Sequence, residues 1–169
     1  MKVVSKLLVL VVITALTLCS CGSAPKSLDA AGEVLAEFHE FSEITGIDWM
    51  LAMVKTESQN KMVNRESSDL KRFDAIFTLR FDAEMVSGVG APNRFSAPYT
   101  AGDNQEISVK LVRSTLMAPL FEPEILKEHE YFNYLQNAYK WNLSGERMEL
   151  YTKNADGAGI ILVFSQNNN

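Results

Sequence analysis

Apolar and polar residues alternate in short runs along much of the chain after residue 46, which is typical of half-buried antiparallel strands. Turn residues separate the runs, as at Ser144-Gly145-Glu146 and Asn154-Ala155-Asp156-Gly157. The run from Gly159 to Phe164 is apolar on both faces and predicts a central strand. The alternating apolar positions are Trp49, Leu51 and Met53; Phe77, Leu79 and Phe81; Ile107, Val109 and Leu111; Tyr139, Trp141 and Leu143; and Met148 with Leu150.

Two other segments carry apolar residues at steps of three and four, which is the period of a helix. Residues 28–41 predict a short amphipathic helix, although Gly32 is unfavourable inside it. Pro123 suits the first turn of a second helix, because its missing N–H costs nothing there, and Glu122 and Glu124 favour the positive end of the helix dipole. The apolar stripes are Leu28, Ala31, Leu35, Phe38 and Phe41 in the first helix, and Ile125, Phe132, Leu135 and Ala138 or Tyr139 in the second.

These elements predict one α+β domain of about 120 residues, a size that buries about two thirds of the surface of the unfolded chain. We expect a compact antiparallel β-barrel-like sheet packed with one main helix, plus the short N-terminal helix. Phe, Met and Trp at inward positions favour an interior filled by side chains.

The N-terminus has the pattern of an export signal. Lys2 and Lys6 are followed by an apolar run, residues 7–18, that is too short to span a membrane stably. Leu18-Cys19-Ser20-Cys21-Gly22 resembles the bacterial lipoprotein processing site, which makes residues 1–20 a signal peptide and Cys21 the predicted lipidation point. The alternative is an ordinary secreted protein whose signal contains cysteines.

Cleavage before Cys21 determines several properties of the mature chain. No disulfide and no thiol nucleophile remain, and the lipid chains would hold the protein on a membrane surface without spanning it. Loss of Lys2 and Lys6 leaves 14 basic residues against 21 acidic ones, a balance that argues against a nucleic-acid partner. Gly22 and Ser23 follow Cys21, and neither is the Asp that resembles an inner-membrane retention signal. This favours a location at the outer membrane of a bacterial cell envelope.

The stretch from Gly88 to Tyr99, GVGAPNRFSAPY, superficially resembles a phosphate-binding loop. Pro92 and Pro98 deny backbone donors to such a loop, and no Gly-Lys-Ser or Gly-Lys-Thr follows. We therefore predict a tight corner between strands, in which the glycines allow positive φ, Pro92 fixes φ and Asn93 bonds the neighbouring backbone. The alternative is a loop in which Asn93, Arg94 and Tyr99 contact a partner or ligand.

Several motifs occur in an order that resembles the META/HslJ family of small bacterial envelope domains. Thr45 to Leu51 resembles the G-x-x-W-x-L opening, and the segment from Gly88 to Tyr99 resembles the central motif around Asn-Arg-Phe. Ser114 to Pro119 resembles the S-T-x-M-A-C segment. The resemblance covers residues 44–165, leaving residues 21–43 as lipidated linker and short helix and residues 166–169 as a disordered tail. The residues that the resemblance implies as structural are Trp49, Gly88, Gly90, Pro92, Thr115, Met117 and Glu124, the last followed by Tyr131, Phe132 and Leu135.

The residues offer little for catalysis or metal binding. Pro92 and Pro119 stand where many relatives carry cysteines, which excludes a redox pair at those positions. His39 is expected to be solvated. His129 falls on or beside the apolar stripe of the second helix and is expected to be packed, while Glu124 and Glu128 predict a solvated acidic face. No calcium-loop or His-x-x-x-His pattern occurs, so we expect neither an enzyme nor a metal or cofactor site.

Two functions follow. The resemblance implies an envelope lipoprotein associated with heat shock and novobiocin resistance, acting through contacts with an envelope protein. The alternative is a module that binds lipid or a small apolar ligand, because a barrel of about eight strands can hold one if side chains do not fill it.

Overall fold

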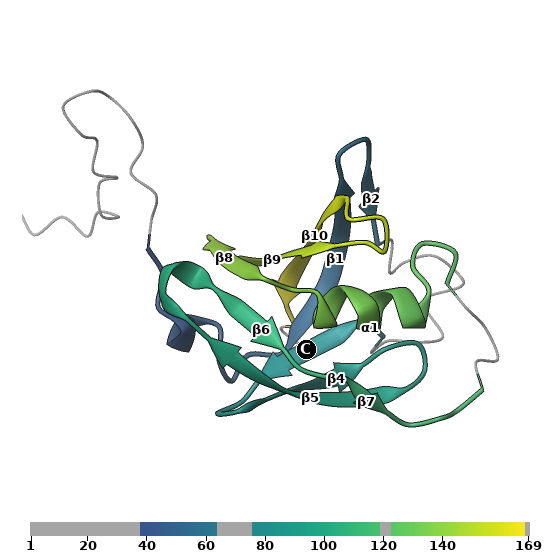
Figure 1. Cartoon of the computed structure of the whole chain (residues 1–169), viewed down its shortest axis with the longest axis horizontal. Coiled ribbons are helices and arrows are strands. Elements are labelled where there is room, and N and C mark those ends of the chain that lie inside the picture. The colour runs from purple at the N-terminus through teal and green to yellow at the C-terminus, as the bar shows by residue number, and fades with distance from the viewer. Residues whose placement is uncertain (1–37, 64–75, 119–122, 168–169) are drawn as a thin grey trace, which may run out of the picture. The chain divides into compact units, whose positions relative to one another are not determined.

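A computed structural model describes residues 38–63, 76–118 and 123–167 (Figure 1). Within these ranges the chain forms a ten-stranded sheet, one α-helix and two 3₁₀ turns. The strands are β1 (Trp49–Thr56), β2 (Asn60–Met62), β3 (Thr78–Phe81), β4 (Met85–Val89), β5 (Arg94–Ala101), β6 (Ile107–Val109), β7 (Arg113–Ser114), β8 (Lys140–Ser144), β9 (Arg147–Lys153) and β10 (Gly159–Gln166). The helix is α1 (Glu128–Gln136), and the 3₁₀ turns are η1 (Phe41–Glu43) and η2 (Asp103–Gln105).

The strands form a nearly closed antiparallel barrel. Their order is β6-β5-β4-β3-β1-β10-β9-β8, with β2 beside β1 and β7 beside β5. The two ends of this order meet, because Glu106 forms a bridge with Lys140 and the Ile107 N–H donates to the Tyr139 carbonyl (3.2 Å). In Figure 1, α1 lies between the layer of β8, β9 and β10 and the layer of β4, β5 and β7. The α+β class and the barrel-like sheet expected from the sequence are therefore confirmed.

Side chains fill the interior of this barrel. The alternation of the sequence predicts most of them, and the ladder between β9 and β10 pairs buried Leu150 with buried Leu162. The helix adds Tyr131, whose hydroxyl donates to the Thr78 carbonyl oxygen (3.1 Å). The largest side chains with almost no exposure are Trp49, Trp141, Tyr131, Phe77, Phe81, Phe164, Ile44, Leu51, Leu79, Leu135, Met148 and Leu150.

Among the positions where the alternation fails, Met53 and Leu111 do so for local reasons. A β-bulge in β1, between Leu51 and Met53, adds a residue, so Val54 takes the inward position expected of Met53. Leu111 was expected to continue the alternation of β6, but β6 ends at Val109 and the Leu111 side chain is 72% exposed.

The main helix begins later than the sequence predicts. Lys127 is extended, and its N–H donates to the Glu130 carboxylate (2.9 Å), so the helix starts at Glu128 rather than near Pro123. Glu124 therefore precedes the helix and is exposed. His129 is also exposed, which contradicts the expected packing.

Much of the N-terminal prediction lies outside the described residues, including residues 1–20, Cys21, Gly32 and the first ten residues of the predicted helix 28–41. The described part begins at Phe38, followed by η1. His39, expected to be solvated, has a side chain only 12% exposed, and its Nδ1 lies 3.1 Å from a Glu43 carboxylate oxygen. Among the described residues, no helix has the length and apolarity needed to cross a membrane.

Candidate functional site

The corner between β4 and β5 has the tight geometry that the sequence predicts, but its glycines serve another purpose. Neither Gly88 nor Gly90 has a positive φ. A Cβ on Gly88 would instead overlap the Thr78 carbonyl, and a Cβ on Gly90 would lie 2.6 Å from Glu128 Oε1. The glycines are needed because neighbouring strands and α1 approach the backbone closely. The Ala91-Pro92 bond within the corner is cis.

Glu128, at the start of α1, supplies the acceptors for this corner. Its Oε1 accepts the N–H groups of Ala91 (2.5 Å) and Asn93 (2.7 Å), and its Oε2 accepts the Asn93 side-chain amide (2.7 Å). These backbone N–H groups have no partner in the β4–β5 ladder, so an acceptor from elsewhere in the fold is required. One carboxylate therefore joins the corner to the helix.

Asn93 extends this connection to the segment after β7. Its side chain is buried, with the residue 5% exposed. Nδ2 donates to the Met117 carbonyl (3.1 Å) as well as to Glu128, while Oδ1 accepts from Thr115 Oγ1 (2.8 Å) and the Met117 N–H (2.7 Å). Two donors and two acceptors make up the full hydrogen-bonding capacity of an amide. Asn93 thus connects three segments, and we call Glu128, Asn93 and Thr115 the corner lock.

The motifs in the sequence point to Glu124 as the structural glutamate, whereas the fold uses Glu128. Glu128 is part of the corner lock rather than of a solvated acidic face, and Glu124 has no role in it. Glu130 supplies half of a capping box by accepting the Lys127 N–H, but Lys127 has no side-chain acceptor, so the sequence carries no clear signal for this boundary. With that boundary, Glu128 becomes the first helical residue, close to the positive end of the helix dipole.

Arg94 lies next to the lock but faces solvent. Its N–H donates to Thr115 Oγ1 (3.2 Å), and its carbonyl accepts the Thr115 N–H (3.0 Å). Phe95 is buried, so its neighbours Arg94 and Ser96 point outward, and Arg113 lies opposite Ser96 in the β5–β7 ladder.

Two apolar residues that follow β7 are also exposed. The Leu116 side chain is 97% exposed, and that of Met117 is 52% exposed although its backbone is held by Asn93. We call Arg94, Arg113, Leu116 and Met117 the β7 surface. The corner lock therefore holds a segment that presents both arginines and apolar side chains to solvent.

Tyr99 belongs to another part of the barrel. It follows Asn93 by six residues, about 20 Å along an extended strand. Its hydroxyl donates to the Asp82 carbonyl (2.6 Å), and its ring packs against Phe41 and Phe81 (ring centroids 5.2 and 5.1 Å apart). Burial, with the nearby Asp82 carboxylate, raises the pKa of Tyr99. The structure therefore does not bring together the three residues that the sequence suggested as one contact site.

The remaining motif residues have clear positions. Trp49 is fully buried, and its Nε1 donates to the Ile44 carbonyl (3.0 Å), which ties β1 to the segment after η1. Pro92 is half-buried in the corner. No group of His, Cys, Asp and Glu suited to a metal ion occurs among the residues that the structure describes.

The fold and this site define a small antiparallel barrel whose helix α1 locks a proline-containing corner. The chain belongs to the META domain family, whose pattern matches residues 42–167. This finding confirms the family that the motifs resemble. No curated protein matches the sequence.

The solved structures that are similar to the chain include the following two. One is the NMR structure of a protein from Burkholderia xenovorans, with 20% identity and a TM-score of 0.55, covering 89% of this chain and 96% of that one. The other is the crystal structure of a DUF4847 family protein from Bacteroides vulgatus, with 14% identity and a TM-score of 0.49, covering 76% of this chain and 97% of that one. The first likeness shows the fold alone.

Proposed function

We propose that this META domain protein is a lipid-anchored protein of the bacterial cell envelope that acts without catalysis, by binding a protein partner in envelope stress or antibiotic tolerance. The observation that carries the proposal is the β7 surface, where exposed Arg94 on β5 and exposed Arg113 on β7 are joined by exposed Leu116 and Met117 on the segment that follows β7. Cys21 supplies the anchor, and membership of the META domain family supports the stress role.

The composition of the β7 surface favours a protein partner. Arg and Met are enriched at protein interfaces, and Arg is common among the residues that contribute most of the binding energy. The corner lock holds Met117 and Thr115 through the Asn93 amide, so less conformational entropy is lost when a partner binds. Arg94 and Arg113 favour a partner with an acidic face, because complementary charge speeds and orients association.

Site-specific photocrosslinking in intact cells tests this proposal. A photoreactive residue at Leu116 should join the protein to one recurrent envelope protein, whereas the same residue at Glu146, an exposed position in the β8–β9 turn, should not. The double variant Arg94→Glu, Arg113→Glu should abolish the Leu116 adduct without lowering the thermal midpoint, because both side chains are exposed. The proposal fails if both positions yield the same set of proteins, or if the adduct survives charge reversal.

A second candidate, binding of a small apolar ligand in the barrel, rests on one observation. The Trp141 Nε1 atom is buried and has no hydrogen-bond partner among the described residues. A ligand with a single acceptor atom could satisfy this donor. Against it stands the filled interior around Trp49, Phe81 and Phe164. An apolar dye tests this candidate. Saturable binding of the dye to the domain and its displacement by an apolar ligand would favour the candidate, and the absence of any saturable apolar site would exclude it.

A further inference from the structure

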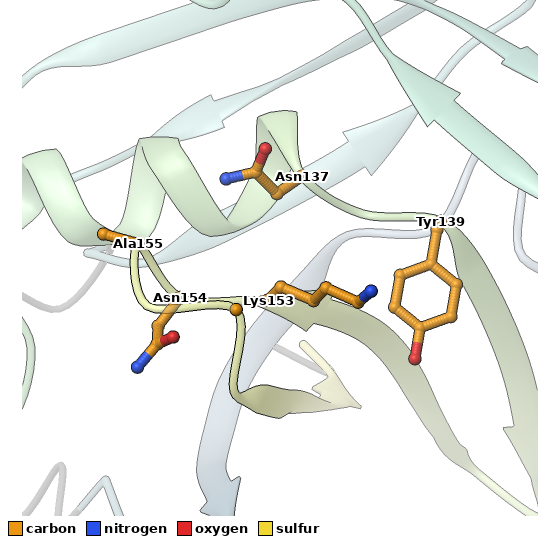
Figure 2. A pocket seen from close by; sticks show the side chains of 6 residues that line it. Asn137, Tyr139, Lys153, Asn154 and Ala155 are labelled. Atoms are coloured by element: carbon orange, nitrogen blue, oxygen red, sulfur yellow. The ribbon is translucent and has the colours of Figure 1, made fainter.

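A hollow lies where the end of α1, the start of β8 and the β9–β10 hairpin meet (Figure 2). Its volume is about 590 Å³, and it is lined by Asn137, Tyr139, Lys153, Asn154, Ala155 and Gly157. A second hollow of about 250 Å³ is also lined by Tyr139, together with Tyr151 and Ile160 among others. Because Tyr139 borders both, we treat them as one feature and call it the Tyr139 groove.

Tyr139 presents a large aromatic surface in a fixed position. The sequence alternation placed it inward, but it lies just before β8 and is 48% exposed. Its N–H donates to the Tyr151 carbonyl (3.0 Å), its carbonyl accepts the Ile107 N–H (3.2 Å), and the preceding Ala138 is buried. The backbone is therefore held on both sides while the ring stays open to solvent.

One cation lies over this ring, and two amides line the same hollow farther from it. Lys153 Nζ lies 5.9 Å from the ring centroid, and Figure 2 shows the lysine side chain extending toward the ring. Asn154 Oδ1 accepts the N–H groups of Asp156 (3.0 Å) and Ala158 (2.8 Å), which leaves the Asn154 NH₂ group to act as a donor. Asn137 adds a second exposed amide. No carboxylate lines the larger hollow, whereas the smaller one is lined by Lys55 and Glu57, whose opposite charges balance.

We propose that the Tyr139 groove binds an acidic oligosaccharide. The C–H faces of sugar rings stack on aromatic side chains such as Tyr139, and sugar hydroxyls exchange hydrogen bonds with amides. A sugar carboxylate pairs with the Lys153 ammonium in a charge-assisted hydrogen bond. A wholly apolar ligand would bury these polar groups without partners, and a nucleic acid would need a denser cluster of cations than this hollow offers.

Calorimetric titration of the purified full chain tests the proposal, with tetragalacturonate as the acidic probe and chitotetraose as the neutral one. We expect saturable binding of tetragalacturonate, and binding of chitotetraose weaker by about tenfold or more. Tyr139→Ala and Lys153→Met should each weaken tetragalacturonate binding by about tenfold or more, whereas Tyr139→Phe, which keeps the ring, should stay within about threefold. Lys110→Met is the matched control, because Lys110 is an exposed lysine outside the groove.

The outcomes separate clearly. The proposal is overturned if tetragalacturonate does not bind saturably. It is also overturned if Lys110→Met and Lys153→Met weaken tetragalacturonate binding equally. Equal affinity for both sugars would overturn the acidic assignment. The Tyr139 and Lys153 side chains are exposed, so the variants should keep the thermal midpoint of the wild type. If Tyr139→Ala unfolds, the Lys153→Met titration and sugar-induced NMR shifts of the Asn137 and Asn154 side chains decide the question.

Discussion

Replacement of Glu128 by alanine should destabilise the domain strongly, because the carboxylate is the acceptor for the β4–β5 corner. Without it, the N–H groups of Ala91 and Asn93 and the Asn93 amide lose their shared partner. Only the bonds of Asn93 to Thr115 and Met117 would then keep the corner in contact with the segment at β7.

The size of the effect follows from these three hydrogen bonds. A hydrogen bond to a charged group contributes about 1.5–3 kcal/mol, but Glu128 is only half-buried and water replaces part of what is lost. We therefore expect Glu128→Ala to lower the free energy of unfolding by about 3 kcal/mol. Glu128→Gln should cost about 2 kcal/mol, because one amide end would face the Asn93 NH₂ group donor to donor.

Urea unfolding followed by circular dichroism measures this change. Glu124→Ala is the matched control, because that glutamate is exposed before α1 and should change stability by less than about 0.5 kcal/mol. In a domain of this size, the Glu128→Ala variant should also melt about 10 °C lower than the control. If the two alanine variants unfold within about 0.5 kcal/mol of each other, the corner lock does not stabilise the fold as argued.

Three other predictions concern separate parts of the molecule. Gly90→Ala should cost about 1–3 kcal/mol in unfolding free energy, because its methyl group would collide with side chains of α1, whereas Gly159→Ala, with open space around it, should be nearly neutral in the same assay. Cys21→Ala should release the protein from membranes, and a variant that still fractionates with membranes would refute lipid anchoring. Burial alone would raise the pKa of Glu149, but hydrogen bonds, first from Lys55 (2.7 Å), bring that pKa below its usual value. The resulting stability is present at neutral pH and is lost as the pH falls below about 4 through the lowered pKa, so Glu149→Gln should flatten the acid side of a stability profile. An unchanged acid profile would contradict that assignment.

The strands could be predicted from the sequence because alternation depends on neighbours along the chain. Trp49, Leu79 and Leu150 are buried as their positions predict, and the apolar run in β10 lies at the centre of the sheet between β1 and β9. The composition of these inward positions also predicted the filled interior. Such patterns report which face of a strand is buried, and that is enough to determine the class of fold.

The corner lock could not be predicted in this way. The Glu128 carboxylate bonds N–H groups 35 and 37 residues away, and Asn93 bonds Thr115 and Met117 across 22 and 24 residues. Nothing in the local sequence distinguishes Glu128 from Glu124, since both lie near the start of the same apolar helical stripe. The choice between them depends on where α1 starts and on which backbone donors the closing barrel leaves without partners. Burial can be inferred from a residue's own neighbours in the chain, whereas the partners of a polar group are set by distant segments that meet only when the barrel closes.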